Sequence, residues 1–237
     1  MQQRLEPSRM ADNISRIHRL MAEAALSAGR RPGEVLLCAA CKGRSLDKIR
    51  ESAALPVDLF GENREQELAE NSKAGAYLQK PCHFIGRLQT NKVKKVVGLA
   101  AVIQSVGSLH LLEAIHQEAE RQRITQDILL QVNIGGEASK GGVPEGELWP
   151  ILEAAAGMGH LRVRGLMAIP PPAEYGADNR HFFSGMRSLL EQARDKGLCK
   201  EPPGVLSMGM SDDFEAAIRE GATIVRIGRG IYGDFQE

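Results

Sequence analysis

Polar and hydrophobic residues follow two patterns along this chain, and these predict strands and helices in turn. Short apolar runs are typical of buried strands, and apolar residues that recur every three or four positions are typical of helices. The expected strands are residues 35–41, 57–60, 83–85, 100–105, 127–132, 163–169, 205–208 and 223–227. The expected helices are residues 12–28, 46–53, 64–72, 92–97, 109–121, 147–156, 181–196 and 213–220.

Strands that alternate with helices favour a parallel sheet, because parallel strands need long crossover connections. We therefore expect an α/β fold, a single (β/α)8 TIM barrel over residues 1–237 with an extra N-terminal helix. Only residues 228–237 follow the last expected strand, so the N-terminal helix can occupy the place of a missing final helix. A doubly wound open sheet is the competing architecture.

Composition and charge narrow the functional classes. The formal net charge of the 237 residues is zero, so no overall charge favours nucleic acid or an anionic membrane. Aromatic residues make up only 4%, which leaves few surfaces on which nucleic-acid bases could stack. No apolar run has the length of a membrane span, and the first residues lack a signal-peptide pattern. We expect a cytoplasmic protein.

The four cysteines are expected to be reduced thiols in that compartment. Cys38 and Cys41 have C-x-x-C spacing, but residues three apart on a strand point to opposite faces. No second pair of this kind completes a metal site. We interpret both cysteines as core residues.

Barrel active sites lie at the carboxyl ends of the strands, so the residues that follow each expected strand are the candidates for chemistry. Lys42 follows the first strand and shares a face with Cys38 and Ala40, which directs it toward the barrel mouth. Partial burial there would lower the pKa of its amine, and a neutral amine forms a Schiff base with an aldehyde. The alternative is a lysine that extends into solvent at a strand end.

Two glycine-containing stretches, residues 207–213 and 226–230, follow the last two strands. Glycine lets the backbone approach an anion, and Asp212 and Glu215 have the capping-box spacing of a helix start, where exposed N–H groups favour phosphate. Barrel phosphate sites often use these same two loops. The same glycines could instead only form tight turns.

A Schiff-base lysine and a phosphate site at one barrel mouth match the two attachments of pyridoxal 5′-phosphate (PLP). Arg226 lies beside them, and a fixed cation near the pyridine nitrogen would keep that nitrogen unprotonated and weaken the cofactor as an electron sink. Arg226 could also be a salt-bridged arginine at a strand end. A cofactor-free Schiff-base aldolase for a sugar phosphate explains Lys42 and the glycine-containing loops but leaves Arg226 without a role.

Several motifs resemble one known family, in order and over essentially the whole chain. They are FGEN at 60–63, HFIGRLQTNK at 83–92, GLM at 165–167, LSMGMSDDF at 206–214 and VRIG at 225–228. With them the chain resembles the PLP homeostasis proteins, also called PLP-binding proteins or the YggS/PROSC family. The resemblance implies a barrel similar to the N-terminal domain of alanine racemase, which is fold type III among PLP proteins.

The resemblance also implies the positions that meet the cofactor. It implies that Lys42 carries PLP covalently, as an internal aldimine, and that Ser207 and the backbone at Gly228 and Arg229 hold the phosphate. The other residues that it places beside the cofactor are Asn63, Met167, Gly209 and, at the ring nitrogen, Arg226. It implies no catalytic residue and no metal.

Two positions depart from the family pattern. Cys41 stands where the family usually has Ser, and Arg229 stands where it often has Thr or Ser. The lost hydroxyl removes one phosphate donor, although the backbone N–H remains and the Arg229 side chain could itself contact phosphate. Lys140, in the loop after the fifth strand, could meet anions at the barrel rim, but a surface lysine is the default.

The resemblance implies a PLP carrier or regulator without robust catalysis, which buffers PLP or delivers it to apo PLP-dependent enzymes. We expect a monomer with no nucleic-acid or membrane partner. The alternative, an amino-acid racemase of weak activity, needs an acid–base group on the opposite face of the cofactor. In alanine racemases this group is a tyrosine from the extra domain of a partner subunit. The tyrosines Tyr77, Tyr175 and Tyr232 lie in no matching motif.

Overall fold

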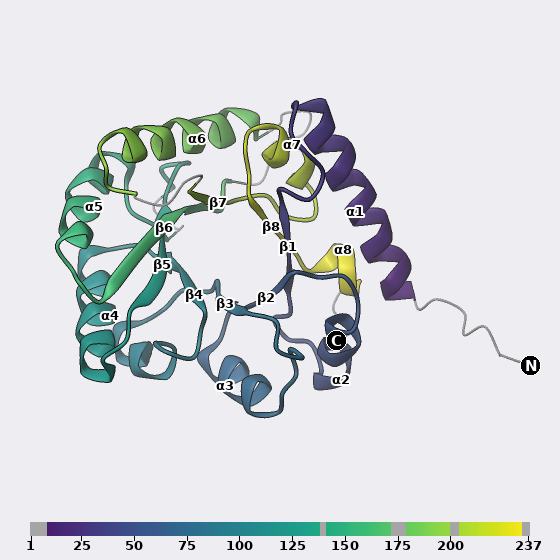
Figure 1. Ribbon diagram of the computed structural model, residues 1–237, viewed down its shortest axis with the longest axis horizontal. Coiled ribbons are helices and arrows are strands. Elements are labelled where there is room, and N and C mark those ends of the chain that lie inside the picture. The colour runs from purple at the N-terminus through teal and green to yellow at the C-terminus, as the bar shows by residue number, and fades with distance from the viewer. Residues whose placement is uncertain (1–8, 138–140, 172–178, 200–203, 234–237) are drawn as a thin grey trace, which may run out of the picture.

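The computed structural model describes residues 9–137, 141–171, 179–199 and 204–233, which form a closed barrel of parallel strands surrounded by helices (Figure 1). The strands are β1 (Leu36–Ala40), β2 (Leu59–Glu62), β3 (Cys82–Phe84), β4 (Val102–Val106), β5 (Gln126–Val132), β6 (Leu161–Ala168), β7 (Val205–Ser207) and β8 (Ile224–Ile227). The helices are α1 (Arg9–Ser27), α2 (Leu46–Ala53), α3 (Glu65–Lys73), α4 (Leu109–Gln122), α5 (Leu148–Ala156), α6 (Arg180–Asp195), α7 (Phe214–Arg219) and α8 (Arg229–Tyr232). Two 3-10 segments, η1 (Thr90–Lys95) and η2 (Glu145–Glu147), complete the described elements.

Pairing of the first strand with the last closes the sheet. β1 lies parallel to β8 in a register that joins Leu36 to Ile224 and Ala39 to Ile227, and every other strand pairs with its neighbours in sequence. A doubly wound sheet would have two unpaired edges and a reversal of strand order. The structure therefore confirms the (β/α)8 barrel and excludes the open sheet.

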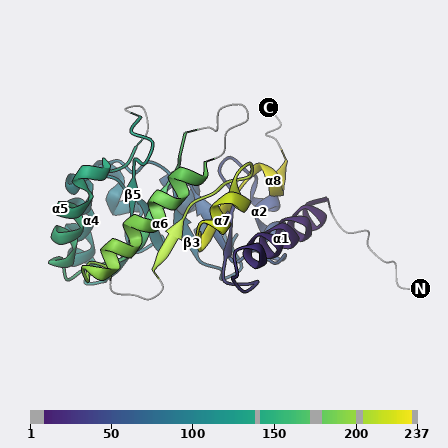
Figure 2. The same cartoon turned by 90° about the horizontal axis from the view of Figure 1, so that it is seen from above.

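The helix α1 covers the barrel where β8 meets β1, next to α7 and α8 (Figures 1 and 2). Its apolar residues recur on one face and are buried: Met10, Ile14, Ile17, Met21, Ala24 and Ala25. Asn13 donates to the carbonyl of Ile231 in α8 at 3.1 Å, and Arg219 of α7 donates to Ser27 at 3.2 Å. The N-terminal helix thus takes the place of a long final helix, as expected. The sequence pattern did not reveal the short helix α8.

Buried side chains form two hydrophobic clusters, one around the barrel and a small one within it. The inner cluster consists of Cys38, Leu59 and Ile224, with Val205 packed against it. Cys41 belongs to the outer cluster, so the two sulfurs of the C-x-x-C pair face opposite sides of the strand, as alternation along β1 requires. Both are free thiols in the core, as expected.

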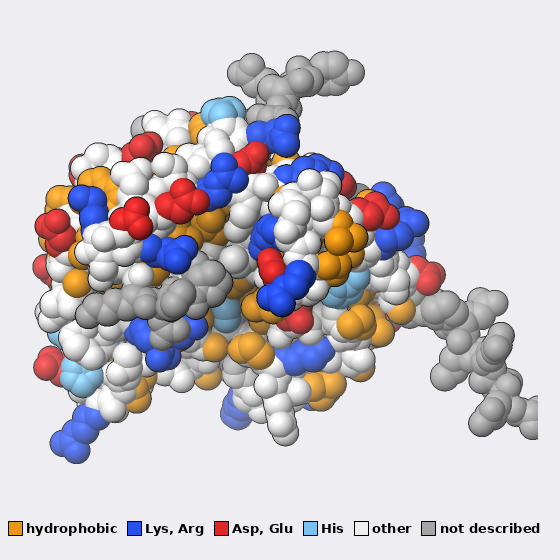
Figure 3. Space-filling model, turned by 45° about the horizontal axis from the view of Figure 1, so that its top comes forward, with side chains coloured by type: hydrophobic (Ala, Val, Ile, Leu, Met, Phe, Trp, Pro, Cys, Tyr) orange, Lys and Arg blue, Asp and Glu red, His pale blue; other side chains and the backbone are white. Residues whose placement is uncertain are grey.

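One expected helix has a different form. Residues 92–97 were expected to be helical, but the chain instead makes the 3-10 segment η1 (Thr90–Lys95), whose start lacks a side-chain cap. Lys92 and Lys95 both lie near the Glu65 carboxylate, at 2.7 and 3.7 Å. These two lysines of η1 therefore form ion pairs with α3. Figure 3 shows acidic and basic side chains mixed over the visible face of the molecule.

Candidate functional site

A pocket of about 270 Å³ opens at the carboxyl ends of the barrel strands. Its walls come from the ends of β1 and β8 and from the segments that follow β1, β2, β3, β6, β7 and β8. The described residues that line it are Ala40, Lys42, Arg44, Asn63, Ile85, Ile169, Met210, Ser211, Asp212, Arg226, Gly228 and Arg229. Four of these are cations and one is a carboxylate, so the pocket favours an anionic ligand.

Lys42 reaches the pocket because it lies two residues beyond the end of β1. The Cys41 N–H donates to the Gly61 carbonyl at 3.0 Å, which keeps the chain extended one residue beyond Ala40. Gly43 then has a φ of +66°, a conformation that favours glycine, and turns the chain away. Lys42 lies on the same side of the chain as Ala40, and both line the pocket as expected. The expectation of partial burial was wrong, since Lys42 is exposed at the mouth.

Ser211, Asp212, Gly228 and Arg229 form one wall of the pocket. The Gly230 N–H donates to Ser211 Oγ at 3.2 Å, which joins the loop after β7 to the start of α8. The Arg229 guanidinium donates to the Asp212 carboxylate, and both side chains are mostly exposed. This wall offers hydroxyl and guanidinium donors to an anion.

The expected capping box is absent from this wall. The helix α7 starts at Phe214 after Asp213, which makes no side-chain cap hydrogen bond. Asp213 instead accepts from the Met210 N–H at 2.7 Å, and Asp212 is paired with Arg229. Asp213 thus holds the loop through Met210, and Asp212 links the loop to Arg229 at the start of α8.

Arg226 contributes a buried cation to the pocket. Its guanidinium donates to Ser207 Oγ at 2.6 Å and to the Ala168 carbonyl at 2.9 Å. Burial lowers its pKa from 12.5 to about 10, because the low-polarity interior disfavours the charged form. The group therefore stays charged near neutral pH, and no ion pair links it to a carboxylate in the described part of the chain. The salt-bridge interpretation of Arg226 is wrong.

The structure brings five of the eight expected cofactor-binding residues into the pocket wall: Lys42, Asn63, Arg226, Gly228 and Arg229. The other three lie beneath or behind it. Ser207 and Met167 are fully buried neighbours across β6 and β7. Gly209 has a φ of +90°, and a Cβ there would lie 2.6 Å from Ala217, so it shapes the turn after β7.

Sequence reasoning did not select Ser211 or Arg44 as ligand-binding residues, although both line the pocket. Ser211 lies in the same glycine-containing stretch as Ser207, and the position of the turn at Gly209 decides which serine reaches the pocket. Arg44 donates to the Gly233 carbonyl at 2.6 Å and lies over the Tyr232 ring at 5.3 Å. Nothing in the local pattern signals that contact with the end of the chain. Lys140 lies outside the described residues.

A buried carboxylate lies directly behind the segment that carries Lys42. Glu62 accepts hydrogen bonds from Cys41 at 3.1 Å, from Asn71 at 2.8 Å and from Tyr77 at 3.0 Å, all at one oxygen. Its other oxygen has no partner among the described residues. Burial raises the pKa of Glu62 despite these donors, and it also raises the pKa of the Cys41 thiol.

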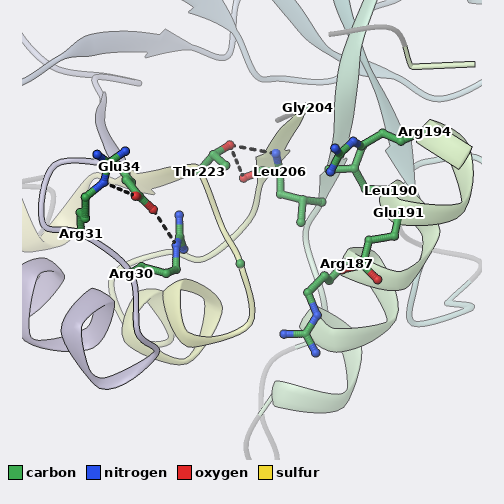
Figure 4. Close-up of a pocket in the computed structure, with 11 residues that line it drawn as sticks. Arg30, Arg31, Glu34, Arg187, Leu190, Glu191, Arg194, Gly204, Leu206 and Thr223 are labelled. Atoms are coloured by element: carbon green, nitrogen blue, oxygen red, sulfur yellow. Dashed lines mark hydrogen bonds and ion pairs between the residues drawn. The ribbon is translucent and has the colours of Figure 1, made fainter. Parts of the chain in front are cut away.

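A larger hollow, about 510 Å³, lies at the opposite end of the barrel near the starts of β7 and β8 (Figure 4). Three of the four arginines that line it have partners of their own. Arg30 donates to the carbonyls of Ile218 and Ala222 in and after α7, Arg31 pairs with Glu34, and Arg187 pairs with Glu220. Because active sites of such barrels lie at the carboxyl ends, we assign the functional site to the smaller pocket.

The described residues contain neither a metal-binding cluster nor a membrane-spanning helix. No group of three or more His, Cys, Asp or Glu side chains among them could hold a metal ion. None of the helices in these ranges is long and apolar enough to cross a membrane.

The fold and the pocket define a barrel of the alanine racemase N-terminal domain class, and the family model described as "Alanine racemase, N-terminal domain" matches residues 7–236. Alanine racemase of Clostridium difficile 630 superposes with a TM-score of 0.69 at 16% identity, over 95% of this chain and 58% of that one. This likeness concerns the fold alone.

Closer relatives specify the family. A pyridoxal phosphate homeostasis protein of Aquifex aeolicus is 40% identical, over 94% of this chain and 97% of the relative. One from Pseudomonas aeruginosa is 38% identical, over 95% and 96%. PipY of Synechococcus elongatus PCC7942, solved with PLP bound, has a TM-score of 0.77 at 29% identity, over 90% of this chain and 100% of that one. The chain belongs to the pyridoxal phosphate homeostasis protein family.

Proposed function

We propose that this protein binds PLP in the pocket at the carboxyl ends of the strands and serves PLP homeostasis, without robust catalysis of its own. The named function of its relatives and the PLP-bound structure of PipY support the proposal. The observation that carries it is the meeting, in one pocket, of an exposed lysine amine, a cationic wall and a buried arginine.

The residues of the pocket fit the chemistry of this ligand. PLP supplies an aldehyde that joins covalently to an amine, and a phosphate that anchors the ring. Lys42 provides the amine and is accessible from the mouth. Ser211 and Arg229 provide donors for the phosphate, so the phosphate role expected for Ser207 moves to Ser211. Arg226 presents a cation to the ring.

Two features of the site favour binding of PLP over catalysis with it. A guanidinium with a pKa of about 10 stays charged and keeps a neighbouring ring nitrogen unprotonated, which weakens electron withdrawal from the ring. The two described tyrosines are also unsuited to a second acid–base role. Tyr77 bonds to Glu62 and Tyr232 to Ser52, both are buried with a raised pKa, and neither lines the pocket. Trace racemase activity is therefore the secondary possibility.

The test is absorbance of the full chain with added PLP, before and after borohydride, followed by peptide mass mapping. We expect a visible band that borohydride converts into a stable adduct on Lys42. Lys42→Ala should lose the adduct and keep weaker, phosphate-anchored binding, whereas the exposed Lys73→Ala should match the parent. A parent protein without band or adduct would reject the proposal and favour the cofactor-free aldolase.

The second part of the proposal concerns the transfer of PLP to other proteins. We propose that the protein acts as a monomer in the cytoplasm and releases PLP to apo PLP-dependent enzymes. Mixing the loaded protein with such an apo enzyme should restore enzyme activity faster than the same amount of free PLP in the presence of a PLP-trapping amine. Equal rates would contradict delivery and leave only buffering.

A further inference from the structure

A row of four hydrogen-bonded polar side chains crosses the inside of the barrel beside the pocket. Arg226 of β8 donates to Ser207 of β7 at 2.6 Å, and Ser207 donates to Oε1 of Gln104 in β4 at 2.5 Å. The Gln104 amide nitrogen lies 2.7 Å from Nδ1 of His83 in β3. Their exposed fractions are 5, 0, 0 and 6%, so all four are buried. We call these four residues the interior chain.

The hydrogen bonds of the interior chain run in one direction, from Arg226 to His83, with the Gln104 amide oriented as in the structure. A guanidinium can only donate, so Ser207 Oγ accepts from Arg226. The serine proton then points to the acceptor oxygen of Gln104, which leaves the Gln104 amide to donate to Nδ1 of His83. The neutral imidazole therefore carries its proton on Nε2. The orientation of the Gln104 amide, with Oε1 toward Ser207, therefore sets the tautomer of His83.

The far end of the chain is suited to remain an acceptor. Burial lowers the pKa of His83 from 6.5 to about 4, so its imidazole is neutral near neutral pH and keeps one unprotonated nitrogen that can accept from the Gln104 amide. A protonated His83 would place a donor against the Gln104 amide and reverse the chain. With His83 neutral, the direction from Arg226 to His83 is available near neutral pH.

The layer next to the interior chain shows that a polar filling is not required here. Cys38, Leu59 and Ile224 fill the neighbouring part of the barrel with apolar atoms. Buried polar groups cost free energy unless all are satisfied, and an apolar layer avoids that cost. What the polar layer provides instead is a fixed guanidinium, held on two sides by Ser207 and by the Ala168 carbonyl. Arg226 also lines the pocket.

We propose that Ser207 and Gln104 are positioning residues that hold the Arg226 guanidinium against the ligand, with His83 as the acceptor that ends the chain. The ligand edge that meets Arg226 must then be a hydrogen-bond acceptor, such as an unprotonated ring nitrogen. The identity of the ligand rests on the proposed function. The direction of the chain belongs to the ligand-free protein and can be tested alone.

The first test uses the ligand-free full chain labelled with ¹⁵N. Two-bond ring correlations at neutral pH should show His83 with a proton on Nε2 and none on Nδ1. In Gln104→Met the Nδ1 loses its donor, and its nitrogen resonance should move toward that of a free unprotonated nitrogen. A parent His83 protonated on Nδ1, or a resonance that Gln104→Met leaves in place, would overturn the proposed chain.

The second test compares two buried serines with added PLP. Ser207→Ala removes the Arg226 acceptor, whereas Ser105→Ala, on β4, removes a buried hydroxyl that has no hydrogen-bond partner among the described residues. Loss of one hydrogen bond to a charged group should weaken PLP binding about tenfold and shift the absorption band of the bound cofactor. Ser105→Ala should keep the parent affinity and band, and Ser207→Thr, which keeps the hydroxyl, should restore much of both.

The outcomes separate this inference from the proposed function. If the parent binds PLP but Ser207→Ala and Ser105→Ala share its affinity and band, the positioning role is wrong while PLP binding stands. If the parent binds no PLP, the proposed function fails. The ring correlations of the ligand-free protein then still show whether the hydrogen bonds of the interior chain run from Arg226 to His83. Should Ser207→Ala not fold, Gln104→Met gives the same comparison from the next link.

Discussion

His83 allows a quantitative test of the electrostatics inside the barrel. Its imidazole is buried between β3 and β4, and its pKa falls from 6.5 to about 4 on folding, mainly because burial disfavours the charged ring. As the pH falls below 6.5 the unfolded chain takes up a proton on this residue, and the folded chain does not until about pH 4. The difference in proton uptake lowers the free energy of unfolding as the pH drops through that window.

The magnitude follows from the two pKa values. A lowering of this size is worth about 3 kcal/mol once the pH is below both values, since each pKa unit corresponds to about 1.4 kcal/mol. Between pH 7.5 and pH 5.0 the same linkage gives a loss of about 2 kcal/mol from His83 alone. In urea that loss moves the unfolding midpoint by about 1 M, for a slope of about 2 kcal/mol per molar.

The assay is equilibrium urea unfolding at both pH values for the parent and for His83→Gln, which removes the titrating group and keeps a polar side chain. The parent should lose about 2 kcal/mol more stability than His83→Gln on going from pH 7.5 to 5.0. His110→Gln, at an exposed position on α4, should behave like the parent. Equal pH losses in the parent and His83→Gln would refute the assignment of a neutral, buried imidazole.

Three further predictions concern the pocket and its surroundings. The fold raises the pKa of Glu62, so its contribution to stability is fully present below pH 4.5 and is lost as the pH rises through the pKa of the folded state. The melting temperature of Glu62→Gln should therefore depend less on pH than that of the parent. An unchanged pH profile would contradict the burial argument. Gly209→Ala should destabilise by at least about 2 kcal/mol in urea, since it adds strain at positive φ to a 2.6 Å clash with Ala217; a neutral effect would show that the turn adjusts. Asp212→Asn should tighten PLP binding about threefold by freeing Arg229, and Arg229→Ala should weaken it about tenfold; calorimetry showing the reverse order would remove Arg229 from the phosphate wall.

Much of the fold could be predicted because its elements are local. The helix α2 (Leu46–Ala53) and the helix α4 start at the caps Ser45 and Ser108, whose side chains accept hydrogen bonds from backbone N–H groups. Their apolar spacing and caps are properties of a few neighbouring residues. The short α8 and the 3-10 form of η1 depend on distant partners, Ser52 for Tyr232 and Glu65 for Lys92, and no local pattern encodes these.

Some residues of the site could likewise be predicted from the sequence, and others could not. Strand ends are visible in sequence, and so Lys42, Asn63 and Arg226 were expected at the barrel mouth and line its pocket. That Ser211 rather than Ser207 lines the pocket was not visible in the sequence, because it depends on where Gly209 turns the chain and on the hydrogen bond from Arg226 to Ser207.

The sequence by itself determined the order of strands and helices, the barrel class and the cationic chemistry at its mouth, because these follow from periodicity and from residues at strand ends. Only the tertiary structure decided which polar side chains share the barrel interior. His83, Gln104, Ser207 and Arg226 come from four strands far apart in the chain, and the closure of β1 on β8 fixes the geometry that brings them within hydrogen-bond reach. That placement makes Ser207 a hydrogen-bond partner of Arg226.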